Sequence, residues 1–308
     1  MDAGRAAGEW RRAAVLLLAA LVFSVTDPVA LVLPVVAVVW LAHCARDPRA
    51  VFLALAALAV GGWAASDSPV LGWERGWPLL VAGAFLWVDL RRPRWPLTAR
   101  ALAGVALAGA AAALVFAVWP GGWRQLDAEV RWAFRQRADE FLARGLDPAV
   151  RDRIEPSVRT AVEWAASLFP GSVALASMAA LGLAEFVRRR WQGAAGRALP
   201  PLREFRFDDH WIWCWIAGLA LVVAPVGPVF GRLGANAVFV FGALYALRGL
   251  GVLAALLAGR PPAVAWLGAL VAVLLLPILW VLLLGALALG LSDTWWDLRA
   301  RWARARRP

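Results

Sequence analysis

Lysine is absent from the chain, so all 32 basic residues are arginine. A phosphate-binding loop of the G-x-x-x-x-G-K-[ST] type needs its lysine, because the ammonium group reaches the nucleotide phosphates. The chain therefore does not contain a P-loop ATPase of its own. Although the formal net charge is +11, the arginines lie in clusters between apolar runs and do not form one basic face. We therefore expect no nucleic-acid partner.

Histidine and cysteine are nearly absent as well. The two histidines, His43 and His210, do not form an H-E-x-x-H motif, so a zinc protease is not expected. The two cysteines, Cys44 and Cys214, do not support a disulfide framework, and no G-x-S-x-G motif is present. We therefore predict no catalytic residues, no metal ligands and no cofactor, and we expect that the protein is not an enzyme.

Charged side chains are scarce, at 17% of the residues, whereas 62% are hydrophobic and the mean hydropathy is +0.67. Soluble domains carry about 25% charged residues, and a single soluble core cannot hide this much apolar surface. The sequence predicts an all-α, polytopic transmembrane helical bundle of about eight to ten membrane segments, forming a single membrane domain over residues 1–308. The apolar segments lie at approximately 13–25, 29–44, 51–65, 77–90, 101–119, 169–187, 211–226, 233–258, 262–276 and 278–292.

Arginine clusters set the expected orientation in the membrane. Short arginine-rich loops are retained in the cytoplasm, and all of them can lie there if residues 13–44 and 262–292 turn back as hairpins. Alternatively, these segments are re-entrant loops whose backbone ends are covered by protein. We predict cytoplasmic N and C termini and a location in the cell inner membrane, with the lipid bilayer around the apolar helices.

Residues 121–165 are the one sizeable polar segment. Their eight arginines and eight acidic residues cancel in charge, which is compatible with the outer side of the membrane. Apolar residues recur every three or four positions from Leu126 to Phe141, as in an amphipathic helix, and Asp147-Pro148 is a typical helix start. We predict two extracytoplasmic amphipathic helices, either a solvated structural hairpin or a lid over a substrate site.

Polar side chains inside apolar segments are costly in lipid and are therefore candidates for function. Asn236, Tyr245 and Arg248 interrupt the segment 233–258, and Tyr245 shares a helical face with Arg248. We predict that these three residues bind a small anionic or polar solute in an internal pocket. Alternatively, Arg248 extends to the cytoplasmic interface, and Asn236 joins two helices by a hydrogen bond.

A second candidate site follows the last apolar segment. Asp293 and Asp297 are four residues apart and are expected on one helical face, and Arg299 and Arg301 come directly after them. We predict that these four residues form a cytoplasmic docking or gating site. Alternatively, the two acids neutralise the nearby arginines.

Small residues recur every four positions in two segments, a pattern that lets helices approach closely. The two stripes are Gly104, Ala108 and Ala112, and Ser172, Ala176, Ala180 and Ala184. They predict tight packing within the bundle or against another membrane subunit.

Three stretches of the C-terminal half carry a family resemblance. They are LPPLREFRFDDHWIWCWIAGLALVV (199–223), GANAVFVFGALYALRGLGVL (234–253) and GLSDTWWDLRAR (290–301). They resemble the C-terminal half of the YybS-like (DUF2232) family of predicted bacterial membrane proteins, over approximately residues 168–303. The resemblance implies a distant similarity to the substrate-binding membrane subunits of energy-coupling-factor importers, which bind a vitamin-like solute and rely on a separate ATPase module.

Two hypotheses for the function remain. The first is a transporter-type subunit that binds a small solute within the bundle and works with a separate ATPase or transmembrane coupling subunit. The alternative is a non-transporting scaffold that organises envelope or membrane partners. The scaffold hypothesis is favoured by the small-residue stripes, the segment 121–165 and the charged C-terminal tail.

Overall fold

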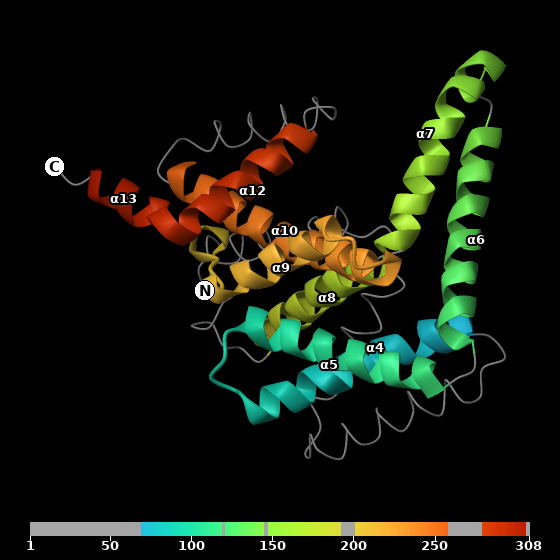
Figure 1. Cartoon of the computed structure of the whole chain (residues 1–308). Helices are drawn as coiled ribbons and strands as arrows, with labels where there is room; N and C mark the ends of the chain where they lie inside the picture. The colour runs from blue at the N-terminus through green and yellow to red at the C-terminus, as the bar shows by residue number, and fades with distance from the viewer. Residues whose placement is uncertain (1–68, 119–120, 145–146, 192–200, 258–278, 306–308) are drawn as a thin grey trace. The chain divides into compact units, whose positions relative to one another are not determined.

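The computed structural model describes residues 69–118, 121–144, 147–191, 201–257 and 279–305. Over these ranges the regular elements are all helices, and they divide between two compact units, Met1–Ala198 and Leu199–Pro308 (Figure 1). The all-α prediction is therefore confirmed for the described residues. The expected hairpin 13–44, the segments 51–65 and 262–276, and Cys44 lie outside them.

In the first unit, α4 (Pro69–Arg91) and α5 (Leu97–Val118) pack side by side. Their approach is close because Gly104 of α5 has no side chain. A Cβ atom at this position would lie 2.9 Å from the Cα atom of Phe85 on α4. Ala108 is fully buried in the same hydrophobic core, so the first small-residue stripe is a helix-packing surface, as predicted.

Another apolar helix described in this unit, α8 (Phe169–Trp191), packs against α4 and α5. Its predicted small-residue stripe has no exposed surface at Ser172, Ala176, Ala180 and Ala184. Between these positions, the Trp77 Nε1 atom of α4 donates a hydrogen bond of 2.9 Å to the Ser177 hydroxyl of α8. The pair satisfies two polar groups that are buried in the core.

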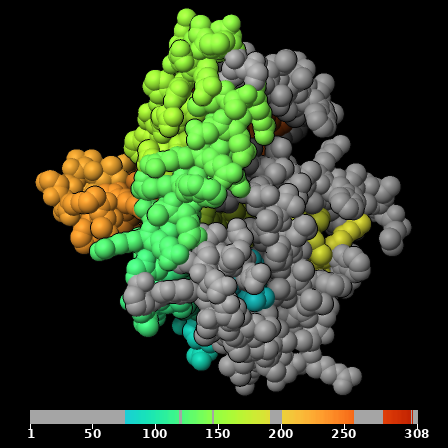
Figure 2. Space-filling view, turned by 90° about the vertical axis from the view of Figure 1, so that its right-hand side faces the viewer, coloured from blue at the N-terminus to red at the C-terminus, as the bar shows by residue number. Residues whose placement is uncertain are grey.

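Between α5 and α8 the chain forms a hairpin of two helices, α6 (Gly122–Ala143) and α7 (Pro148–Ser167). The two helices lie side by side along their length (Figure 1), and Figure 2 shows them together on one face. Val130 and Val162 are buried on the inner sides of the hairpin. The prediction of two amphipathic helices is confirmed, and their position outside the membrane stays a prediction.

The start of α7 follows from two adjacent residues. The Asp147 carboxylate accepts a hydrogen bond of 2.8 Å from the backbone N–H of Ala149, one of the donors that a helix N-terminus leaves without a helical partner. Pro148 occupies the first helical position, where its missing N–H is not needed. The sequence signal for this helix start therefore corresponds to a real cap.

The second unit is built around one long helix. Its described elements are the short 3-10 helices η1 (Leu202–Glu204) and η2 (Asp209–Trp211) and the α-helices α9 (Ile212–Val223), α10 (Pro228–Leu257), α12 (Leu279–Trp296) and α13 (Leu298–Ala305). The central helix α10 contacts α9, α12, α13 and η1. Charged residues from η2, α12 and α13 are thereby brought to the same part of α10.

Glycines set the closest helix crossings of this unit. A Cβ atom on Gly234 of α10 would lie 2.6 Å from the backbone oxygen of Gly218 on α9. Further along α10, a Cβ atom on Gly249 would overlap the backbone oxygen of Ala286, and one on Gly290 of α12 would overlap that of Tyr245. The backbones of α10 and α12 therefore meet where only glycine fits on both helices, and this crossing brings the last turn of α12 to Arg248.

Three described helices are long and apolar enough to cross a membrane, namely Leu97–Val118, Phe169–Arg190 and Pro228–Leu257. Two shorter apolar helices, Asp209–Val223 and Val281–Trp296, lie in the second unit. Apolar side chains on the outside of α5, such as Leu114 and Val118, are 69% and 84% exposed, as expected for contact with lipid. The chain is thus an all-α membrane protein, and the cytoplasmic placement of its termini stays a prediction.

Candidate functional site

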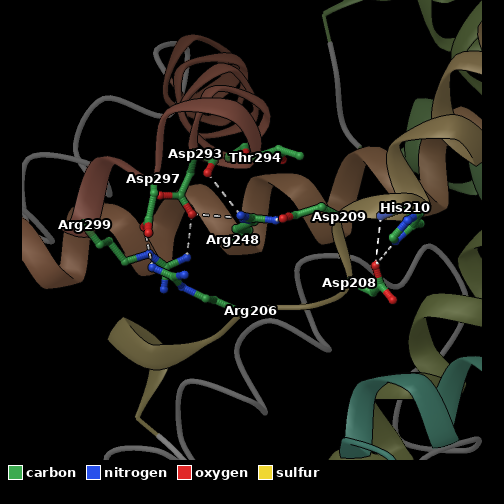
Figure 3. A network of polar contacts seen from close by, with 10 residues as sticks. Arg206, Asp208, Asp209, His210, Arg248, Asp293, Thr294, Asp297 and Arg299 are labelled. Carbon is green, nitrogen blue, oxygen red and sulfur yellow. Dashed lines mark hydrogen bonds and ion pairs between the residues drawn. The ribbon is translucent and has the colours of Figure 1, made fainter. Parts of the chain in front are cut away.

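The deepest charges of the second unit meet where α10 and α12 cross (Figure 3). Arg248 lies on α10 and is 2% exposed, and Asp293 lies near the end of α12 and is 1% exposed. A charge taken out of water in an apolar surrounding is unfavourable by several kcal/mol unless it is paired and hydrogen-bonded. The contacts of Arg248 therefore decide whether this part of the fold is stable.

Arg248 is held by two acids that come from different elements. Its Nε atom donates to Asp293 Oδ2 at 3.0 Å, and its Nη2 atom donates to the backbone oxygen of Asp293 at 3.2 Å. Its Nη1 atom donates to Asp209 Oδ1 at the start of η2. Figure 3 shows the guanidinium group between the two carboxylates. Arg248 thus uses all three of its nitrogen atoms in contacts within the unit.

Asp293 accepts from a second arginine. The Arg299 Nη2 atom of α13 donates to Asp293 Oδ2 at 3.0 Å, and its Nη1 atom donates to the backbone oxygen of Arg203 at 2.9 Å. The Arg299 side chain is only 8% exposed. Two buried guanidinium groups therefore share one buried carboxylate, and Asp209 supplies the second negative charge that makes the group neutral.

Asp297 joins this cluster from its edge. It has a φ of 38°, a left-handed conformation that ends α12 at Trp296 and lets α13 begin at Leu298 in a new direction. Its carboxylate accepts from Arg206 Nη2 at 2.6 Å, in a half-exposed ion pair. Asp293 lies in the last turn of α12 and Asp297 directly follows that helix, and the Asp297 backbone N–H donates to the Asp293 backbone oxygen at 3.3 Å.

The predicted docking set separates into buried and exposed members. Asp293 and Arg299 are buried in ion pairs, and Asp297 is paired at the surface. Arg301 is exposed, and its backbone N–H donates to the Asp297 backbone oxygen at 3.1 Å. These contacts match the alternative interpretation, in which the acids neutralise arginines, and a docking role for the four residues stays a prediction.

Tyr245 and Arg248 share a face of α10, as expected, and both are buried against the segment 205–211. The Tyr245 ring lies 4.8 Å from the ring of Phe207, centroid to centroid, and the Arg248 guanidinium lies 6.0 Å from the same Phe207 ring. Arg248 is 2% exposed, and the alternative in which it extends to the cytoplasmic interface stays a prediction. The sequence interpretation missed Phe207 and Asp209, which complete this site.

Three buried polar atoms of the cluster have no hydrogen-bond partner among the described residues. They are the Tyr245 hydroxyl, Asp293 Oδ1 and Arg299 Nε. The Tyr245 hydroxyl lies beside the Thr294 side chain. Buried polar groups are almost always paired in folded proteins, so the concentration of three such atoms around Asp293 marks this cluster as chemically unusual.

Asn236 does not belong to this cluster. Its Nδ2 atom donates to the backbone oxygen of Arg232 in the preceding turn of α10, at 2.8 Å. Tyr245 is nine residues further along the chain, about 13 Å up the helix axis and on the opposite face of α10. The three residues predicted to contact one solute therefore do not converge, and only Tyr245 and Arg248 come together.

The first unit holds a second set of buried charges. Glu185 of α8 is 1% exposed and accepts from Arg188 and Arg189, one turn further on in the same helix. Asp89 of α4 pairs with Arg100 of α5. These ion pairs connect residues of one helix or of neighbouring helices, and each of them neutralises buried charge locally.

A hollow of about 230 Å³ lies between α6 and α7. Its polar lining comes from Arg135, Asp139, Arg159 and Glu163, which are largely exposed or already paired across the hairpin. The Arg131 and Arg135 guanidinium groups both donate to Glu163. Donation from Arg135, helped by Arg131, holds the pKa of Glu163 below its usual value. This hollow is part of a salt-bridged hairpin, and the hypothesis that the hairpin is a lid stays a prediction.

Comparison with known families gives one match. Residues 13–294 match the family described as "Predicted membrane protein (DUF2232)". The match confirms the resemblance seen in the C-terminal half and extends it through most of the chain, including Arg248 and Asp293. No curated protein and no solved structure matches the chain. The similarity to importer subunits stays a prediction.

Proposed function

Since the chain belongs to the DUF2232 family of predicted membrane proteins, we propose that it is a transporter-type subunit that binds a small polar solute beside Arg248. Ionisable residues inside membrane helices are rare and commonly mark a solute or ion pathway. Arg248 is such a residue, in the long apolar helix α10, and the buried Asp293 pairs with it from the helix that crosses α10. The proposal places the solute in the second unit, against the face of α10 that carries Tyr245.

The observation that carries the proposal is the group of unpaired polar atoms around Asp293. An unsatisfied buried donor or acceptor is unfavourable by about 1–3 kcal/mol, and the Tyr245 hydroxyl, Asp293 Oδ1 and Arg299 Nε all lack a partner among the described residues. A solute with donor and acceptor groups gains binding free energy by satisfying them. A purely structural ion-pair cluster gains nothing from leaving these atoms unpaired.

The energy for transport comes from another protein in this proposal. The chain has no lysine, so it has no P-loop in which nucleotide could be hydrolysed. The proposed partner is a separate ATPase, acting directly or through a transmembrane coupling subunit. The similarity to importer subunits that the sequence resemblance implies is consistent with this division of labour.

A thermal-shift screen of the purified protein in detergent tests the proposal. The probes are vitamins, nucleobases, amino acids and organic anions, and a solute at a hundredfold excess over its Kd stabilises the folded state by about 2.7 kcal/mol. We expect at least one stabilising solute whose effect is lost in Tyr245→Phe. Asn236→Ala is the matched control, because Asn236 lies on the same helix outside the cluster.

A solute effect that persists in Tyr245→Phe and disappears in Asn236→Ala would place binding elsewhere and contradict the proposed site. A screen in which no probe stabilises the protein would count against a solute-binding function. Direct binding of a radiolabelled hit, compared between the same two variants, distinguishes binding from a general effect on the detergent micelle.

A scaffold for envelope or membrane partners is the second candidate, and exposed aromatic residues on the α6–α7 hairpin favour it. Trp132, Phe141 and Trp164 are 65%, 51% and 62% exposed, and large exposed apolar side chains often mark interaction surfaces. We expect a stable partner to be recovered with the chain in mild detergent and to be lost when Trp132 and Trp164 are replaced by serine. Purification of the wild-type chain alone, after cross-linking in membranes, would contradict the scaffold function.

A further inference from the structure

The two acids that hold Arg248 differ sharply in exposure. The Asp293 side chain is fully buried, whereas the Asp209 side chain is 57% exposed, although it contacts an Arg248 side chain that is only 3% exposed. We propose that Asp209 occupies the place of a carboxylate on the solute, and that an anionic solute binds by displacing Asp209 from Arg248. This inference rests on the proposed function and gives it a chemical class of solute.

The contacts of Arg248 assign separate tasks to its nitrogen atoms. The Nε and Nη2 atoms donate to the side chain and the backbone of Asp293, which fixes the guanidinium group on α12. The Nη1 atom is bound by Asp209 Oδ1 alone among the described residues. Since Asp209 is exposed, Nη1 is the nitrogen that an incoming carboxylate can reach. One oxygen of that carboxylate takes the position that Asp209 Oδ1 holds.

Charge balance requires the incoming group to be an anion. Arg248 and Arg299 carry two positive charges, and Asp293 and Asp209 carry two negative charges. If Asp209 leaves without replacement, the buried group keeps one uncompensated positive charge, which is strongly unfavourable in an apolar surrounding. A carboxylate on the solute restores neutrality, so release of Asp209 and binding of the anion are coupled.

Aromatic contacts on both sides of Asp209 keep the segment in place during this exchange. Phe207 packs on Tyr245, and the Trp211 ring stacks on Phe241 of α10 at 5.7 Å between centroids. The segment also passes so close to α10 that a Cβ atom on Gly251 would lie 2.6 Å from the backbone oxygen of Leu202. Rotation of the Asp209 side chain into solvent is therefore sufficient, and the backbone need not open.

Acetate is the probe for this inference, because it is a carboxylate of the same size as the group it would replace. Asp209→Ala removes the internal carboxylate and leaves Nη1 of Arg248 open. If Asp209 occupies Arg248 for at least about nine-tenths of the time, the apparent affinity for acetate rises roughly tenfold or more in this variant. The measurement is the midpoint of thermal unfolding against acetate concentration, with chloride substituted to keep the ionic strength constant.

Asp208→Ala is the matched control. Asp208 is the adjacent acid, its side chain is 64% exposed, and its carboxylate binds His210 rather than Arg248. We expect acetate to stabilise Asp209→Ala strongly and to affect Asp208→Ala no more than the wild type. Asp209→Asn is a second test variant, because its uncharged side chain fills the same space and leaves no cavity beside Arg248. Its response to acetate should therefore be weaker than that of Asp209→Ala.

Equal responses to acetate in Asp209→Ala and Asp208→Ala would overturn the inference. The inference and the proposed function can fail separately. In one case, a neutral solute binds the wild type and needs the Tyr245 hydroxyl, and acetate does not stabilise Asp209→Ala. This result would support solute binding and overturn the inference that the solute is an anion. A strong response of Asp209→Ala to acetate, with no solute found for the wild type, would support the carboxylate site and count against transport.

Discussion

Arg248 of α10 donates to both the side chain and the backbone oxygen of Asp293, which lies 45 residues further along the chain in α12. Asp293 is thus the only acid in the described cluster that fixes Arg248 from inside the unit, since Asp209 approaches from the exposed side. Removing one partner of a buried ion pair leaves an uncompensated charge, which destabilises proteins by about 3–5 kcal/mol. The α10–α12 crossing therefore depends on this pair.

Replacing Asp293 by asparagine is expected to lower the free energy of unfolding by about 3 kcal/mol or more, because Arg248 and Arg299 both lose a charged partner. Chemical unfolding in detergent measures the change. Asp297→Asn is the control, since its pair with Arg206 is half-exposed, asparagine tolerates the left-handed backbone, and such surface pairs contribute at most about 1 kcal/mol. Equal effects of the two substitutions would show that burial of Asp293 does not matter.

Gly290→Ala is expected to separate α10 from α12. The new Cβ atom would overlap the backbone oxygen of Tyr245, and backbone cannot move aside as a flexible side chain can. Overpacking of a well-packed contact is unfavourable by about 1–3 kcal/mol, and we expect at least the upper value here. The free energy of unfolding in detergent measures this loss.

Gly285 of the same helix supplies the control for that experiment. A Cβ atom there meets nothing within 4 Å, so Gly285→Ala should be neutral or stabilise α12 by up to about 1 kcal/mol, the difference in helix propensity. If Gly290→Ala were as stable as Gly285→Ala, the close crossing of α10 and α12 would be contradicted.

The α6–α7 hairpin should lose stability in acid because of Glu163. Hydrogen bonds from Arg135 and Arg131 lower the pKa of Glu163 in the folded state. Its contribution is therefore fully present above the unfolded value of about 4.3, and it is lost as the pH falls through the lower, folded pKa. Because the pair is partly exposed, the contribution is at most about 1 kcal/mol. Hydrogen exchange of the α6 and α7 amides between pH 7 and pH 3 measures it.

Glu163→Gln should remove that part of the acid sensitivity, since glutamine does not titrate. Glu140→Gln is the control on α6, because among the described residues Glu140 accepts from Gln136 and from no arginine. The Glu140 variant should keep the acid response of the wild type. An unchanged response in Glu163→Gln would mean that the arginine contacts of Glu163 do not stabilise the hairpin.

Features within one segment of the chain were predictable from the sequence. Hydropathy located α5, α8 and α10, and the Asp147-Pro148 pair located the start of α7. The small-residue stripes of α5 and α8 also faced the core as expected. Each of these signals depends on residues a few positions apart, within the reach of a single helix, so the pattern contains the information.

Features that join distant segments were not predictable in the same way. Asp209 and Arg248 are 39 residues apart, and nothing in their spacing shows that η2 lies against α10. The left-handed conformation of Asp297, which ends α12, was not indicated by the sequence pattern. Conversely, Asn236 was grouped with Tyr245 because both interrupt one apolar run, although they point to opposite faces of the helix. Pairing across the fold decided each of these cases.

Tyr245→Phe separates stability from binding. The Tyr245 hydroxyl is buried without a hydrogen-bond partner among the described residues, and such a group is unfavourable by about 1–3 kcal/mol. Phenylalanine keeps the ring contact with Phe207, 4.8 Å between centroids, and removes only the hydroxyl. The free energy of unfolding without solute should therefore stay the same or rise by about 1 kcal/mol, as measured by chemical unfolding in detergent.

If the Tyr245 hydroxyl had a purely structural role, its removal would lower the free energy of unfolding, and the variant would unfold more easily than the wild type. Greater stability together with lost solute binding is the combination that the proposed site requires.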